Sequence, residues 1–122
     1  MRLVDSNILI YAAKPQYPQL RLLLEQEDIA VSELTKLEVL GFRNLTEEEE
    51  EYFYAVFSLV TVIPISTEII NKAIELRQQS KMKAADAIIA ATTLLHCTEL
   101  ITRNTDDFDH IIDLIINNPI DL

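Results

Sequence analysis

Four groups of oxygen-bearing side chains stand where a strand is predicted to end or a helix to begin. Asp5 ends a short apolar strand, Glu38 lies within a predicted helix, and Asp86 opens another helix that is almost entirely apolar. The segment TRNTDDFD, residues 102–109, directly follows a further strand. In open α/β folds, binding sites form at the carboxyl ends of the strands. These side chains therefore predict a site built from carboxylate and amide oxygens.

Each group also has a purely structural explanation. Asp5 is placed to cap the helix that follows it, although Ser6 or Asn7 could do so instead. Asp86 would interact favourably with the dipole of its own helix N-terminus. Residues 102–109 are also typical of an Asx-rich turn. Only the convergence of all four groups favours a functional site over these local roles.

Glu38 is placed by helical periodicity. Leu34, Leu37, Glu38 and Gly41 lie on one ridge of a helix, and this ridge is expected to face the sheet. A carboxylate there would be unfavourable without a partner. The alternative is a flank position, from which the side chain reaches water.

Short strands and helices alternate along the chain. Apolar, β-branched runs predict strands at residues 3–5, 28–32, 60–64 and 99–102. Caps and helical periodicity predict helices after Asp5 to about Lys14 and at residues 18–26, 33–44, 47–59, 68–81 and 83–96, with the helix in 33–44 ending around Gly41. Residues 111–116 are expected to form a last strand or a short helix. This order predicts a parallel sheet covered by helices on both faces, in one domain spanning residues 1–122.

Composition limits the function further. The chain has 122 residues, 49% of them apolar, which suffices for one real core. Its net charge of −10 argues against nucleic-acid binding through a general basic face. A polyanionic substrate would require local neutralisation, most simply by bound metal. The single cysteine, Cys97, favours a reducing compartment, and neither a signal peptide nor a membrane span is expected, so we predict a cytoplasmic protein.

Converging carboxylates repel one another and need a cation. A site made of oxygen ligands suits Mg²⁺ or Mn²⁺, whereas Zn²⁺ would favour the two histidines, which lie too far apart in the chain. With one glycine in the chain, phosphate loops and dinucleotide fingerprints are excluded. Lys81 and Lys83 lie just before Asp86, so this helix start could also meet a phosphate or a partner carboxylate.

Four segments together resemble a known family. They are VDSNILIYAA at residues 4–13, SELTKLEVL at 32–40, KAADAIIAATTL at 83–94 and LITRNTDDF at 100–108. In this order the sequence resembles the PIN domain, in particular the small VapC-type ribonucleases of prokaryotic toxin–antitoxin pairs. The resemblance implies a PIN-like three-layer α/β/α sandwich with a central parallel sheet of four to five strands. It also implies a Mg²⁺- or Mn²⁺-dependent endoribonuclease.

The resemblance assigns the metal and catalytic positions to four residues: Asp5, Glu38, Asp86 and Asn104. Because Asn104 is neutral, the nearby Asp106 and Asp107 become further candidates for the fourth position. Ser6 and Thr102 fall beside the acids and are candidates for binding phosphate or metal-bound water. In this scheme Asp5 and Asp86, assisted by Glu38, hold the metal, and Glu38 orients or deprotonates the attacking water.

The resemblance further implies an RNA substrate, a small antitoxin partner and a homodimer. The main alternative is a PIN-like scaffold without catalysis that serves as a protein-binding module. A receiver-type signalling domain also gathers acids around Mg²⁺, but it needs an acceptor Asp after its third strand. The strand predicted at residues 60–64 ends in Pro64, which argues against that class.

Overall fold

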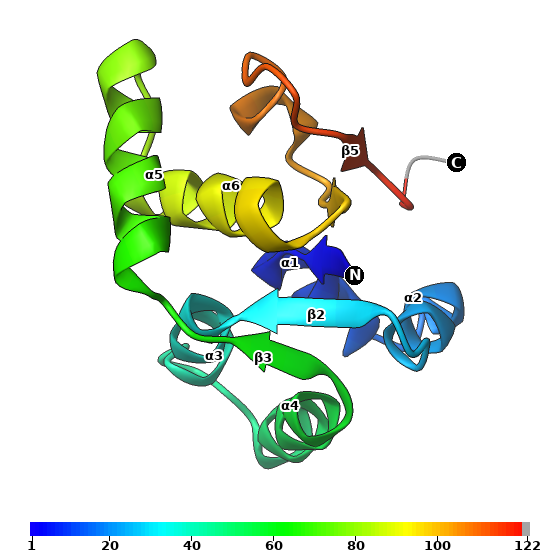
Figure 1. Ribbon diagram of the computed structural model, residues 1–122. Helices are drawn as coiled ribbons and strands as arrows, with labels where there is room; N and C mark the ends of the chain where they lie inside the picture. The colour runs from blue at the N-terminus through cyan, green and yellow to red at the C-terminus, as the bar shows by residue number, and fades with distance from the viewer. Residues whose placement is uncertain (121–122) are drawn as a thin grey trace.

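One parallel sheet of five strands forms the centre of the computed structural model, which describes residues 1–120 (Figure 1). The strands are β1 (Arg2–Val4), β2 (Ile29–Ser32), β3 (Thr61–Ile63), β4 (Glu99–Ile101) and β5 (Ile116–Asn117). The helices are α1 (Ser6–Ala12), α2 (Pro18–Leu24), α3 (Glu33–Leu40), α4 (Glu47–Leu59), α5 (Thr67–Gln79), α6 (Ala84–His96) and the 3₁₀ turn η1 (Thr105–Asp107).

The strand order is β3-β2-β1-β4-β5, and every neighbouring pair is parallel. The chain moves outward from β1 to β2 and β3, and later returns to the other side of β1 with β4 and β5. The order therefore reverses between β1 and β4, where a doubly wound fold forms its crevice. Pairing continues just past β1, because the Asp5 N–H donates to the Ile101 carbonyl at 2.9 Å.

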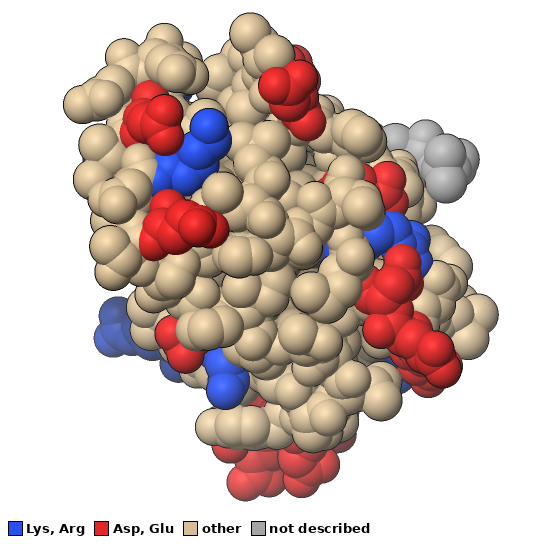
Figure 2. Space-filling model, in the orientation of Figure 1, with Lys and Arg blue, Asp and Glu red and all other residues tan. Residues whose placement is uncertain are grey.

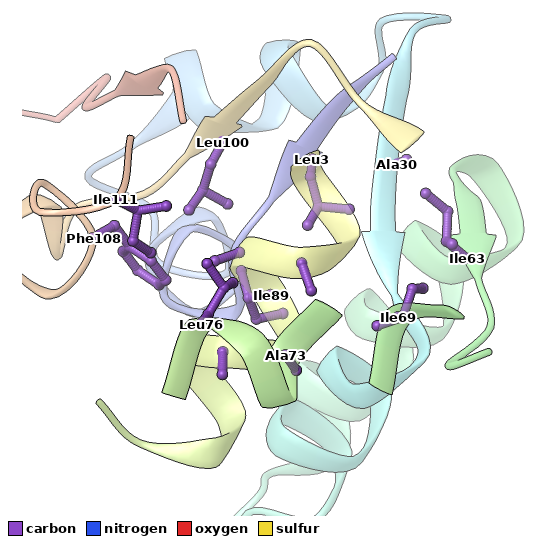
Figure 3. Packing of buried hydrophobic residues seen from close by; sticks show 13 residues of the cluster. Leu3, Ala30, Ile63, Ile69, Ala73, Leu76, Ile89, Leu100, Phe108 and Ile111 are labelled. Atoms are coloured by element: carbon purple, nitrogen blue, oxygen red, sulfur yellow. The ribbon is translucent and has the colours of Figure 1, made fainter. Parts of the chain in front are cut away.

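Alternation along the strands creates two apolar cores, one on each face of the sheet. Leu3, Ala30 and Leu100 face α5 and α6, and the next residue of each strand faces α1 to α4. Figure 3 shows the core on the first of these faces, where Leu76 and Ala73 of α5 belong to the same cluster as the strand residues. The predicted α/β/α sandwich with a parallel central sheet is thus confirmed, with five strands.

Helix caps explain most of the element starts. Thr46 and Glu49 form a capping box at α4, and the Ser66 hydroxyl accepts from the Ile69 N–H at α5. At α1 the cap is Asp5, so the expectation that Ser6 or Asn7 caps this helix is wrong.

The ridge predicted on α3 does not face the sheet. The buried residues of α3 are Thr35 and Val39, whereas the Leu37 side chain is 70% exposed. The helix packs between α1 and α4 and ends at Leu40 with Gly41 as its C-cap, in agreement with the predicted end around Gly41. Eight residues give too short a pattern to fix which face is covered, and the neighbouring helices decide it.

The end of the chain also differs from the prediction. Residues 111–115 form turns and irregular backbone, and only Ile116–Asn117 pair with β4 as a strand. Asp113 lies within this segment at a φ of 71°, a left-handed conformation that Asp tolerates better than most residues. Residues 121 and 122, the end of the predicted domain, lie outside the described part. Within that part, none of the helices combines the length and apolarity needed to cross a bilayer.

Candidate active site

Asp5 lies at the carboxyl end of β1 and is only 7% exposed. Its Oδ1 accepts the Ser6 N–H at 2.9 Å, and its Oδ2 accepts from Asn7 Nδ2 at 3.1 Å and from Thr102 Oγ1 at 2.9 Å. Burial raises the pKa of Asp5, these three hydrogen bonds oppose the rise, and the charge of Asp107 adds to it. Asp5 therefore caps α1 and also lies near other acids, so its role as a helix cap is compatible with a place in a functional site.

Thr102 joins the ends of β1 and β4. It is fully buried, and its Oγ1 accepts from Asn7 Nδ2 at 3.0 Å and from the Asn104 N–H at 3.1 Å while it donates to Asp5. Asn7 completes the connection, because its Oδ1 accepts the Arg103 N–H at 3.1 Å. The side chains around Asp5 therefore form one hydrogen-bonded unit across the switch between the two strands.

Asn7 belongs to this unit, although its position in the sequence predicts only a possible helix cap. The available signal was its position two residues after a strand-ending aspartate, where an amide can both donate and accept. Its second partner lies more than 90 positions away in the chain, and the local pattern carries no trace of that contact.

Glu38 lies on α3, near enough to Asp5 for the two charges to interact, although much of its side chain is exposed. Partial burial of its carboxyl raises the pKa of Glu38, the charges of Asp5 and Asp86 raise it further, and a hydrogen bond with the Ser6 side chain lowers it. Glu38 thus belongs to the acid group even though the ridge used to predict its position was wrong.

Asp86 lies half-buried in the first turn of α6. Burial raises the pKa of Asp86, the charges of Asp107 and Asp5 raise it further, and the nearby Lys83 lowers it. The dipole of the helix start is therefore only part of its surroundings, since the carboxylates of Asp107 in η1 and of Asp5, just after β1, also act on it.

The fourth predicted metal-binding position involves two residues, Asn104 and Asp107. Asn104 is exposed and contributes its backbone N–H to Thr102, while the charge of Asp107 raises the pKa of both Asp5 and Asp86. Asp106 is exposed beside Asp107 and lines the same groove as Asp86. The ligand and catalytic roles of all these residues remain predictions.

The donor set fits a hard divalent cation. An ionised carboxylate offers about four acceptor positions, and three hydrogen bonds reach Asp5, which leaves one position on Oδ1. Within residues 1–120, no three Asp, Glu, His or Cys side chains are close enough to enclose an ion as they stand. Mg²⁺ keeps several waters and is commonly held by one or two carboxylates, so a closed cage is not required.

Comparisons with known proteins identify the family and the fold. A family model for the PIN domain matches residues 2–114. A toxin–antitoxin complex from Klebsiella pneumoniae contains a similar chain, with 35% identity, a TM-score of 0.81 and full coverage of both chains.

More distant structures share the fold. VapBC2 from Rickettsia felis, bound to a DNA fragment from its promoter, gives 23% identity and a TM-score of 0.79 over 96% of this chain and 97% of that one. FitAcB from Neisseria gonorrhoeae gives 24% identity and a TM-score of 0.79 over 100% of both chains. No protein with a curated description matches this chain.

Proposed function

The chain belongs to the PIN domain family, and on that premise we propose that it is a Mg²⁺- or Mn²⁺-dependent endoribonuclease. The observation that carries this proposal is the set of acids around Asp5. Four elements bring carboxylates to one crevice, and Asp5 raises the pKa of both Glu38 and Asp86. Such an arrangement favours the entry of positive charge into the crevice, which is the expected condition of a metal-dependent site.

Each residue has a proposed task. Asp5 and Asp86, with Glu38, would hold the cation, and Asp107 or Asn104 would complete the oxygen set. When bound, Mg²⁺ or Mn²⁺ supplies positive charge to a phosphodiester and acidifies a water molecule. Thr102 and Asn7 fix the orientation of the Asp5 carboxylate through the hydrogen bonds given above.

Glu38 is the proposed general base. Its side chain is more accessible than that of Asp5, and its raised pKa makes the carboxylate a better proton acceptor than an ordinary glutamate. Ser6 lies between Asp5 and Glu38 and is the candidate to orient water or a phosphate oxygen.

We extend the proposal to biological partners. The similar chain of 35% identity occurs in a toxin–antitoxin complex. We therefore propose that this protein is the toxin of a type II pair, that it forms a homodimer in the cytoplasm, and that a small antitoxin inhibits it. An antitoxin with a basic segment would complement the −10 charge of this chain.

The test is RNA cleavage by the purified protein with Mn²⁺, with EDTA, and with Mn²⁺ restored. We expect EDTA to abolish cleavage and Mn²⁺ to restore it. Asp5→Asn is expected to reduce the rate at least about 100-fold. The matched control is Asp28→Asn, which removes an exposed carboxylate at the other edge of the sheet and should leave the rate unchanged.

Two results would contradict the proposal. Cleavage that persists in EDTA, or that persists in Asp5→Asn purified in parallel, would show that this site is not responsible. A folded protein that neither cleaves RNA nor binds Mn²⁺ in calorimetry, but binds a partner protein, would favour the non-catalytic binding module.

A further inference from the structure

An open groove of about 520 Å³ lies beside the acid site, between the junction of α5 with α6 and the turn η1. Three acids line it: Asp86, Asp106 and Asp107. Three basic residues within a span of seven positions also line it: Arg77, Lys81 and Lys83. The groove therefore brings basic side chains next to acids of the crevice.

The three basic side chains are available for a ligand. All three residues are exposed, and the ion pairs found within residues 1–120 include none of them. Arg77 Nε donates to the Met82 carbonyl at 3.2 Å, which ties the end of α5 to the following loop. Lys83 acts on Asp86 only through its charge.

Most other basic residues of the chain already have partners. Arg2 pairs with Asp28, Arg21 lies over the Tyr52 ring, and Arg103 and Lys14 lie over the Tyr11 ring. On the face drawn in Figure 2, the few basic atoms lie mostly next to acidic ones. Three unpaired cations in one groove are therefore unusual in a chain with 20 acidic and 10 basic residues.

A chain of net charge −10 repels a polynucleotide at long range, so binding must come from a local concentration of positive charge. We propose that Arg77, Lys81 and Lys83 bind backbone phosphates of the RNA strand on one side of the scissile bond and direct that strand into the acid crevice. This inference rests on the proposed nuclease function and adds the path of its substrate. The three residues position the RNA strand and take no part in the chemical step, since none of them belongs to the acid group.

The experiment compares Lys81→Gln/Lys83→Gln with the wild-type protein in cleavage kinetics and in RNA binding. Binding is measured in the Asp5→Asn background, so that the RNA stays intact. We expect KM and Kd for single-stranded RNA to rise about tenfold at moderate salt, with kcat nearly unchanged. The salt dependence of log K should fall by roughly 1.4, because each phosphate contact contributes about 0.7 on single strands.

Two variants serve as controls. Lys72→Gln removes a basic residue of α5, the helix that carries Arg77, but Lys72 lines a different hollow, so this variant should change neither KM nor the salt dependence. Lys81→Arg/Lys83→Arg keeps the charges and should restore binding. Thermal unfolding of each variant checks that the fold is intact.

The outcomes separate this inference from the proposed function. If the wild type cleaves RNA but the double glutamine variant keeps its KM and salt dependence, the groove proposal is overturned while the nuclease function stands. If only kcat falls, the groove does not bind the strand. If an acidic peptide such as polyglutamate binds the groove and RNA does not, the surface serves a protein partner instead. If the wild type cleaves no RNA, the proposed function itself fails.

Discussion

Asp28 and Asp5 lie at opposite edges of the sheet and face opposite kinds of charge. Asp28 precedes β2, and its carboxylate receives two hydrogen bonds from Arg2, at 2.7 and 2.9 Å. The Arg2 hydrogen bonds lower the pKa of Asp28, and Glu99 lies 3.9 Å from the same guanidinium. Asp5 follows β1, is buried, and has other carboxylates as its charged neighbours, so its pKa is raised.

The two edges therefore serve different purposes. At the amino edge, one arginine joins the starts of β1, β2 and β4 and stabilises the fold. At the carboxyl edge, burial and repulsion raise the pKa values of Asp5, Glu38 and Asp86. Lys83 opposes the rise only for Asp86. An arrangement that opposes stability at one edge only is typical of a functional site.

The binding of a divalent cation at the carboxyl edge is expected to change the stability of the protein most. Mn²⁺ at about 100 times its Kd should stabilise the protein by about 2.7 kcal/mol, or roughly 10 °C in Tm. Asp5→Asn should abolish this shift and Asp28→Asn should keep it, as measured by thermal unfolding with and without Mn²⁺. An equal shift in both variants would mean that the cation binds elsewhere.

Removing the hydroxyl of Thr102 should weaken the carboxyl edge without changing its charge. Thr102→Val keeps the shape but deprives Asp5 of a donor and leaves Asn7 with one partner fewer. We expect a loss of about 2 kcal/mol in the free energy of unfolding and a 10- to 100-fold loss of cleavage activity. Denaturant unfolding and cleavage rates measure the two effects. If both stay at the wild-type level, the Thr102 hydroxyl does not support Asp5 as described.

Removing Arg2 should weaken the amino edge and leave the site intact. Arg2→Ala is expected to lower the free energy of unfolding slightly at neutral pH, with unchanged cleavage. Because Arg2 lowers the pKa of Asp28 in the folded state, this stabilisation is present above the ordinary Asp range and is lost as pH falls through the folded-state value. The difference from wild type should therefore shrink in acid, and a difference independent of pH would exclude this ion pair as its cause.

Neutralising Glu38 should change the free energy of unfolding least, and should raise it where the previous two substitutions lower it. Its pKa is raised, so the folded state holds a proton that the unfolded state has lost, and stability falls as pH rises through the window between the two values. In EDTA at neutral pH, Glu38→Gln should gain a few tenths of a kcal/mol, since its exposed side chain is well screened. The gain should vanish at acidic pH in parallel melting curves, and a destabilised Glu38→Gln would argue against repulsion at this edge.

The sequence determined what depends on neighbours in the chain. The alternation of short strands and helices predicted the parallel sandwich, and Thr46 and Ser66 marked helix starts because caps act over three or four residues. The acids at Asp5 and Asp86 could be predicted as well, since their positions relative to a strand end or helix start are local.

The tertiary structure decided what depends on distant segments. It buried Thr35 and exposed Leu37 on α3, because α1 and α4 select the covered face. It also joined Thr102 to Asn7 and Asp5 across the register of β1 with β4, which no local pattern encodes. Most of the acid residues could thus be predicted from the sequence, while the hydrogen bonds that hold Asp5, and the charge that Asp107 adds to it, arise only when β1, β4 and η1 come together.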